Sequence, residues 1–370
     1  MTTEAQPSDL YYGDYLQLGR LLGAQAPLSR RQGSEAHDEM LFIIVHQTYE
    51  LWFRQILHEL DAVLQAFSAA RLDERRLASI CAKLERISVI QHLLVEQISV
   101  IETMAPQDFL EFRDLLVPAS GFQSLQFRAI EIKLGLREQD RTAFSACAFY
   151  QRFKPADARY LRALHTEPSL FDQVDAWLAR MPFLQDKHYD FWSSYRNSIE
   201  ASLSADQQLI KTHPQLSADD KERQLAQLTQ TRQQFDCLFL PEAYESQRTQ
   251  GLVRLSHRAI QAALFIYLYR DEPLLQQPFG LLKLLVEVDE QLTAWRYRHA
   301  LMVQRMLGRR IGTGGSSGHD YLRTSAERTQ IFGDFFNLAS YLLPRSKLAP
   351  LPAELTRLLD FHFSTLHRDA

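Results

Sequence analysis

One histidine lies on an apolar helical face in the last third of the sequence. Within Trp295–Arg305, a rotation of about 100° per residue puts His299 on one stripe with Trp295, Met302 and Met306. An imidazole among such side chains is poorly hydrated, so its nitrogens need a partner. A metal, a cofactor iron or a carbonyl group could each be this partner. Taken alone, the pattern favours a core histidine that the protein itself satisfies.

A second histidine, His46, lies in a long apolar segment. Phe42 and Phe53 share its face at helical spacing. The other histidines of this segment lie off that face, and neither H-E-x-x-H nor H-x-x-x-H occurs, so local spacing predicts no zinc site. Considered by itself, His46 can be explained as a core histidine that is hydrogen-bonded to the backbone.

Arg113 follows at the end of a short amphipathic segment, on one face with Phe109 and Leu116. A buried guanidinium must meet a carboxylate, because leaving it unpaired costs too much desolvation energy. Its planar fork suits two-point capture of a carboxylate from the protein or from a ligand. An arginine that reaches solvent, or one paired with Glu111 or Asp114, is the competing interpretation.

A glycine-rich segment, Gly312–Gly318, comes after the His299 helix. It lacks the G-K-[ST] ending of a phosphate-binding loop and fails the strict G-x-G-x-x-G pattern, since position 317 is serine. Its glycines would let the backbone approach a ligand closely, and Thr313 supplies a hydroxyl. The composition of this segment fits a flexible cover over a small polar ligand, and it fits an ordinary surface loop as well.

The elements that must position these residues are helices. Apolar residues recur at three- and four-residue spacing, and no run of alternating β-branched residues or internal repeat is visible. The sequence therefore predicts an all-α fold, with a charged amphipathic hairpin at 204–234. Two pairs of long helices should form the bundle around any site: 38–69 with 73–104, and 242–270 with 275–308. A shorter amphipathic helix is expected at 10–25.

Composition narrows the class of protein. The 370 residues include 41 basic and 45 acidic side chains, a formal net charge of −4, which gives no electrostatic case for binding nucleic acid or an anionic membrane. No apolar run reaches 18 residues, and the first nine residues are polar. The three cysteines, Cys81, Cys147 and Cys237, are too few and too scattered for a disulfide framework. We expect a soluble cytoplasmic protein.

Five stretches closely resemble the tryptophan 2,3-dioxygenase family. They occur in the family's order and extend over most of the chain, whereas the segment at about 138–238 matches less distinctly. The longest two, around His46 and His299, are the most specific. The stretches are YYGDYLQLGRLLGAQ (11–25), HDEMLFIIVHQTYELWFRQILHELD (37–61), ETMAPQDFLEFRD (102–114), PASGFQSLQFR (118–128) and WRYRHALMVQRMLGRRIGTGGSSG (295–318).

This resemblance implies one all-helical domain over residues 1–370, in which a large helical bundle encloses a b-type haem. It implies a homotetramer that opens the indole C2–C3 bond of L-tryptophan with O₂. The product would be N-formyl-L-kynurenine, in the first step of tryptophan catabolism by the kynurenine pathway. A non-catalytic helical haem sensor is the alternative; it would need His299 but would have no use for Arg113. A helical scaffold without cofactor is a third hypothesis.

The resemblance also implies residue roles around the haem. His299 matches the axial ligand of the haem iron. The positions at the haem edge and pocket floor are Trp295, Arg128, Ser120 and Gly121.

Further roles are implied around the substrate. His46 matches the distal histidine near the indole N–H, and we prefer a hydrogen-bond acceptor to an obligatory base, because the indole N–H is a very weak acid. Arg113 matches the residue that binds the carboxylate, and Thr313 the hydroxyl near the ammonium group. The remaining substrate-side positions are Phe42, Ile43, Ile44, Val45 and Phe109 in the same subunit, and Tyr12 and Tyr15 from a neighbouring subunit.

Overall fold

The computed structural model describes residues 10–68, 74–141, 149–186, 189–308, 310 and 329–360. Apart from one two-residue ladder, in which β1 (Gln185–Asp186) pairs antiparallel with β2 (Tyr189–Asp190), the regular elements of this part are helical. The prediction of an all-α fold is confirmed. The α-helices are α1 (Tyr12–Tyr15), α2 (Leu18–Leu21), α3 (Leu28–Arg31), α4 (Asp38–Phe67), α5 (Glu74–Ile101), α6 (Pro106–Arg113), α7 (Leu125–Leu134), α9 (Pro155–Leu164), α10 (Leu170–Leu178), α11 (Phe191–Thr212), α12 (Ala218–Phe239), α13 (Pro241–Thr249), α14 (His257–Leu268), α15 (Gln276–Leu307), α17 (Gly333–Asn337) and α18 (Ala353–Leu359).

Short 3₁₀ turns join several of these helices. They are η2 (Asp114–Leu116), η3 (Gly121–Gln123), η4 (Glu138–Asp140), η5 (Pro182–Leu184), η6 (Pro273–Leu275), η7 (Leu338–Tyr341) and η8 (Arg345–Lys347).

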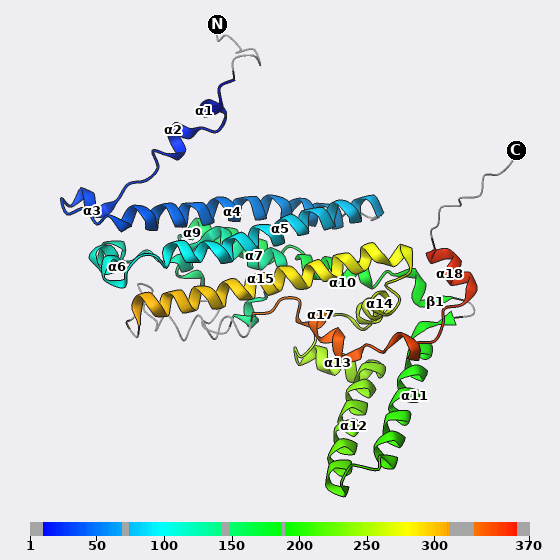
Figure 1. Cartoon of the computed structure of the whole chain (residues 1–370). Coiled ribbons are helices and arrows are strands. Elements are labelled where there is room, and N and C mark those ends of the chain that lie inside the picture. The colour runs from blue at the N-terminus through cyan, green and yellow to red at the C-terminus, as the bar shows by residue number, and fades with distance from the viewer. Residues whose placement is uncertain are drawn as a thin grey trace, which may run out of the picture.

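Three long helices form the centre of the molecule, with α5 packed against both α4 and α15 (Figure 1). The apolar spacing of α5 explains its place, because Ile80, Leu84, Ile87 and Ile98 are all almost completely buried. Each such side chain contributes about 1.5–3 kcal/mol when it leaves water. One hydrophobic core extends from these helices through α10 and α14 to α18.

Helix α7 packs across α4 and completes the frame of the site. It begins at a cap, where the Ser124 hydroxyl accepts a hydrogen bond from the backbone N–H of Phe127. It ends at Gly135, whose φ is +124°, and a Cβ there would lie 2.7 Å from the Cβ of Phe171. Both the backbone conformation and the close approach therefore require glycine. An ion pair between Lys133 and Asp61 also joins α7 to α4.

Two segments project from this centre (Figure 1). Helices α11 and α12 form an antiparallel hairpin that contains the charged segment predicted at 204–234. At the other end, α1 and α2 form an arm that leads away from the start of α4.

Some expected helices are wrong. The helix predicted over 242–270 is two helices, α13 and α14, separated by a turn in which Gly251 has a φ of +76° and Ser256 caps α14. Helix α14 belongs to the main core but packs more against α10 than against α15, and α7 takes its expected place beside the site. The expected helix at 10–25 is two single turns, α1 and α2.

No helix in the described ranges has both the length and the apolar character needed to cross a bilayer. Cys81 and Cys237 are free thiols, and Cys147 lies outside the described residues.

Candidate cofactor and substrate site

A cavity of about 310 Å³ lies between α4, α5, α6, α7 and α15. Its volume is in the range of pockets that hold drug-sized ligands or cofactors. Aromatic and aliphatic side chains cover most of the wall, and charged groups are gathered in a few places. The described lining residues from α4, α5, α6 and Met104 are Phe42, Val45, His46, Tyr49, Glu50, Phe53, Ile98, Ile101, Met104, Phe109 and Arg113; those from 120–152 and α15 are Ser120, Gly121, Phe122, Ser124, Phe127, Arg128, Glu131, Arg152, Trp295, Arg296, His299, Met302, Val303, Met306 and Leu307.

His299 lies on the α15 wall, on the stripe that the sequence predicted. Its ring stacks on the Trp295 indole at a centroid distance of 5.0 Å and an interplanar angle of 7°. Burial, with smaller effects from the nearby His46 and Arg128, lowers its pKa to about 4, so the ring is neutral at pH 7. Its Nδ1 is buried and has no hydrogen-bond partner among the described residues. The described residues therefore do not show His299 as a core histidine whose nitrogens are all hydrogen-bonded within the protein.

His46 faces the same cavity from α4. Its Nδ1 lies 2.7 Å from the carbonyl oxygen of Phe42. Because a carbonyl can only accept, Nδ1 carries the proton and donates, which leaves Nε2 with a free lone pair. Burial lowers the pKa of His46, and the bond to Phe42 opposes this effect only in part. The ring is thus a neutral hydrogen-bond acceptor on the cavity wall.

Arg113 reaches the cavity from the last turn of α6, and its side chain is only 17% exposed. Its Nη1 lies 4.0 Å from the carboxylate of Asp114, which is itself 91% exposed. Such a long contact with a solvated carboxylate contributes little. Close by, the Phe42 ring stacks against Phe109 at 5.7 Å. A guanidinium beside an aromatic slot suits a ligand that has both a carboxylate and a flat ring.

A charged network forms another part of the wall. The buried carboxylate of Glu131 accepts hydrogen bonds from Arg128 and Arg141, both at 2.8 Å, and from Arg296 at 2.9 Å. Burial alone would raise the pKa of Glu131, but the three guanidinium groups outweigh burial and hold it well below its usual range. Arg296 also donates to the carbonyl oxygen of Thr329. This network joins α7 to the helix that carries His299.

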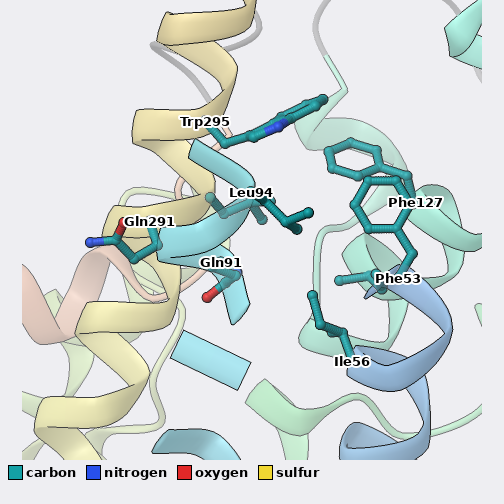
Figure 2. A pocket seen from close by; sticks show the side chains of 9 residues that line it. Phe53, Ile56, Gln91, Leu94, Phe127, Gln291 and Trp295 are labelled. Carbon is teal, nitrogen blue, oxygen red and sulfur yellow. The ribbon is translucent and has the colours of Figure 1, made fainter. Parts of the chain in front are cut away.

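A much smaller cavity of about 10 Å³ adjoins the site. Trp295, Phe53 and Phe127 line both cavities, so their rings form the partition between them. Figure 2 shows these rings together with Ile56 and Leu94, and with Gln91 and Gln291 at one side. This space is sufficient for about one water molecule, so of these two cavities in the described part of the chain only the larger has room for a ligand.

The structure brings together most of the residues predicted for the site. His299, Trp295, Arg128, Ser120 and Gly121, predicted for the cofactor side, all line the cavity. The substrate-side residues that line it are His46, Phe42, Val45, Phe109 and Arg113.

Other predicted residues lie elsewhere. Ile43 and Ile44 do not line the cavity, and Ile44 is 46% exposed. Tyr12 and Tyr15, on the projecting arm, are each 70% exposed and do not reach this cavity. Thr313 lies outside the described residues.

Three residues that line the cavity, Glu131, Arg296 and Arg152, were not predicted from the sequence. A signal for the first was present, since Arg128 and Glu131 are three residues apart on a helix that is otherwise largely apolar. No such signal marks Arg296, because a buried arginine and a solvent-exposed one look alike in a sequence.

The donor set fits a haem better than a metal ion held by protein alone. No group of three or more His, Cys, Asp or Glu side chains in the described part could hold a metal ion. One neutral imidazole with an unpartnered nitrogen, in an aromatic cavity with arginines on its wall, suits a cofactor whose macrocycle brings the remaining iron ligands.

Comparisons with known proteins agree with this interpretation. The family model described as tryptophan 2,3-dioxygenase matches residues 2–342. The tryptophan 2,3-dioxygenase of Alteromonas mediterranea is 50% identical over 352 residues, 95% of this chain and 97% of that protein. Those of Bdellovibrio bacteriovorus and Dictyostelium discoideum are 49% and 48% identical, over 96% of this chain in each case and over 99% and 90% of those proteins. The chain belongs to the tryptophan 2,3-dioxygenase family.

Proposed function

We propose that this protein is a haem dioxygenase that inserts both atoms of O₂ across the indole C2–C3 bond of L-tryptophan and releases N-formyl-L-kynurenine. This is the first step of tryptophan catabolism by the kynurenine pathway. The observation that carries the proposal is the presence of His299, His46 and Arg113 on the wall of one cavity. Each has the chemistry that a different part of the reaction needs.

His299 is proposed to hold the iron of haem b. Its neutral ring is ready to bind iron, since no proton has to leave first. Trp295 stacks on the ring and limits its rotation. Ser120, Gly121 and Arg128 are proposed to contact the haem from the opposite side of the cavity. When bound, the haem supplies the iron chemistry with O₂.

His46 is proposed to hold the indole. Its Nε2 can accept a hydrogen bond from the indole N–H, because Nδ1 is already engaged with Phe42. The ring fixes the orientation of the indole without removing its proton, since a neutral imidazole is far too weak a base for that task. Phe42, Val45 and Phe109 form the apolar wall that packs against the indole. Ile43 and Ile44 are proposed to contribute indirectly, by holding the Phe42–Val45 segment of α4 in position.

Arg113 is proposed to bind the substrate carboxylate. It would select an amino acid over indole itself, because indole has no carboxylate for the guanidinium to bind. Thr313, in the glycine-rich segment, remains the proposed contact for the ammonium group. Together these groups hold the indole in a single orientation, which is the main contribution a protein can make to such a reaction.

We further propose a cytoplasmic homotetramer in which the arm of one subunit brings Tyr12 and Tyr15 to the site of another. The exposed aromatic residues of the arm and the free cysteines support these two proposals.

One experiment separates the dioxygenase from a non-catalytic haem sensor. The purified protein is reduced without oxygen, its visible spectrum is recorded with and without L-tryptophan, and air is then admitted. A dioxygenase shows haem absorption, a spectral change with L-tryptophan and then the absorption of N-formylkynurenine. Haem absorption without product supports the sensor, and a colourless well-folded protein contradicts both.

A further inference from the structure

The arm formed by α1 and α2 has no apolar anchor in its own chain. Neither of its two helical turns contains a buried residue, and both lead away from the bundle (Figure 1). The burial of apolar side chains therefore does not set the direction in which the arm leaves. That direction depends on polar contacts at its base, where the chain passes through α3 into α4.

A buried carboxylate fixes this base. Glu39, in the first turn of α4, is 1% exposed, and Ser29, in α3, is 2% exposed. Glu39 Oε1 accepts a hydrogen bond from the backbone N–H of Leu28 at 2.7 Å. Its Oε2 accepts from the backbone N–H of Ser29 at 2.9 Å and from the Ser29 hydroxyl, whose oxygen accepts from the backbone N–H of Ala36 at 3.0 Å. One side chain of α4 thus holds the start of α3, the next element after the arm.

The three donors suit a charged carboxylate. Burial raises the pKa of Glu39, but the hydrogen bonds from Ser29 and Leu28 outweigh burial and leave the pKa below its usual value. Hydrogen bonds to a charged acceptor are stronger than those between neutral groups. An amide in this place would turn its own N–H groups toward a donor, so it could not make all three bonds.

A second contact lies closer to the arm. Gln25 Nε2 donates a hydrogen bond to Gln47 Oε1 at 2.7 Å, and Gln47 Nε2 donates to the carbonyl oxygen of Ala24 at 3.3 Å. Gln47 is the residue after His46 on α4, and it lies eight residues after Glu39, or about 12 Å along the helix. Two points of attachment define a direction, whereas a single point would let the arm swivel.

We propose that Glu39 and Gln47 are positioning residues that direct the arm toward the site of a neighbouring subunit. The proposal rests on the proposed function, in which Tyr12 and Tyr15 reach that site. An arm held in one direction before it binds loses less conformational entropy when its tyrosines contact the neighbouring subunit. Glu39 and Gln47 touch neither substrate nor cofactor, and they act through the arm.

A double-mutant cycle tests this role. Glu39→Gln should lower the turnover of L-tryptophan several-fold while haem absorption and helical circular dichroism are kept. In a chain that also carries Tyr12→Ala and Tyr15→Ala, the same substitution should cause little further loss, because the arm has already lost its contact. Glu35→Gln is the matched control and should leave turnover unchanged, since this side chain is 53% exposed and lies 3.6 Å from Arg30.

A second measurement does not depend on activity. Limited digestion with trypsin should cleave after Arg20, in α2, faster in Glu39→Gln than in Glu35→Gln. An arm without its anchor spends more time away from the neighbouring subunit, where the protease can reach it. Equal rates of cleavage in the two variants would contradict the proposal.

Other outcomes separate this proposal from the proposed function. An equal proportional loss from Glu39→Gln with and without the arm tyrosines, or no loss in either chain, would overturn the positioning role. Full activity of the chain with both tyrosines replaced would instead defeat the proposed contact between subunits, and a wild type that forms no product would defeat the proposed reaction. If Glu39→Gln does not fold, Gln25→Ala removes the second contact from the arm side and enters the same cycle, where an equal loss in both backgrounds would again overturn the proposal.

Discussion

A single neutral imidazole on α15 is the residue on which the proposed chemistry depends. In His299→Gly the ligand is removed while the cavity keeps its shape, so the protein should lose its haem absorption and keep its helical circular dichroism. Added imidazole should restore much of the absorption by occupying the vacated space. The measurement is a visible spectrum of the purified variant with increasing imidazole.

A matched control accounts for the cost of glycine in a helix, about 1 kcal/mol. His58→Gly places the same substitution at an exposed position of α4 and should keep its haem. Full haem retention by His299→Gly without imidazole would refute the ligand assignment.

The second residue that decides function is Arg113. In Arg113→Gln the substrate carboxylate would enter the cavity without its cation, and we expect L-tryptophan to bind more weakly by roughly 2–5 kcal/mol. Tryptamine, which lacks the carboxylate, should bind the variant and the wild type equally. Both affinities can be measured from the change in the haem spectrum. An equal loss for the two ligands would assign Arg113 to the packing of α6 rather than to the substrate.

The types and positions of the chemistry-bearing residues singled them out, but their roles were implied only by the family resemblance. A histidine on an aromatic stripe and an arginine beside phenylalanines are visible at helical spacing, and His299, His46 and Arg113 do meet at one cavity. What the residues alone left open was their partners. Whether His299 bonds to the protein depends on atoms from other helices, and no spacing along one helix reveals them.

At the scale of elements, α15 anchors the chain that returns at residues 329–332. Asp289 Oδ2 accepts hydrogen bonds from the backbone N–H groups of Ile331 and Phe332, both at 2.8 Å. Asp289→Ala leaves two buried donors without a partner, at about 1–3 kcal/mol each. Asp289→Asn keeps an acceptor oxygen and should cost less. Denaturant unfolding of both variants measures the difference.

The same carboxylate predicts a dependence on pH. Burial raises the pKa of Asp289 from 3.8 to about 6, so between these values the folded protein holds a proton that the unfolded chain has released. Its contribution to stability therefore decreases as pH rises through this window. Relative to the wild type, Asp289→Asn should be more stable at pH 7.5 than at pH 5. A flat difference between pH 5 and pH 7.5 for Asp289→Asn would contradict the raised pKa.

Helices were predictable where one strong apolar stripe continued, as in α4, α5 and α15. The prediction over 242–270 was wrong because an apolar pattern continues across a short polar turn, and only the φ of Gly251 shows that the backbone changes direction there. The place of α7 in the bundle was missed for another reason. Its length gives little periodic signal, and its position is fixed by contacts with α4 and by the ions around Glu131.

At the scale of the whole molecule, a single chain does not explain why the apolar side chains of the arm are exposed. Tyr11, Tyr12, Tyr15 and Leu22 are each at least 70% exposed, on turns that project away from the bundle (Figure 1). Exposed aromatic groups gathered on one segment indicate a surface that another molecule covers. We therefore expect a chain with Tyr12→Ala and Tyr15→Ala to fold and bind haem, but to have reduced turnover of L-tryptophan.

Mixed oligomers can show whether the arm acts between subunits. The arm-deficient chain has an intact cavity, while Arg113→Gln has an intact arm and a defective cavity. If the arm reaches a neighbouring subunit, the two chains expressed together with different tags supply complete sites that neither parent possesses, because the arm of one then serves the cavity of the other. Doubly tagged oligomers should consequently be more active than the mean of their parents. Activity equal to that mean would show that each arm serves its own chain, and full activity of the arm-deficient parent would remove the arm from the site altogether.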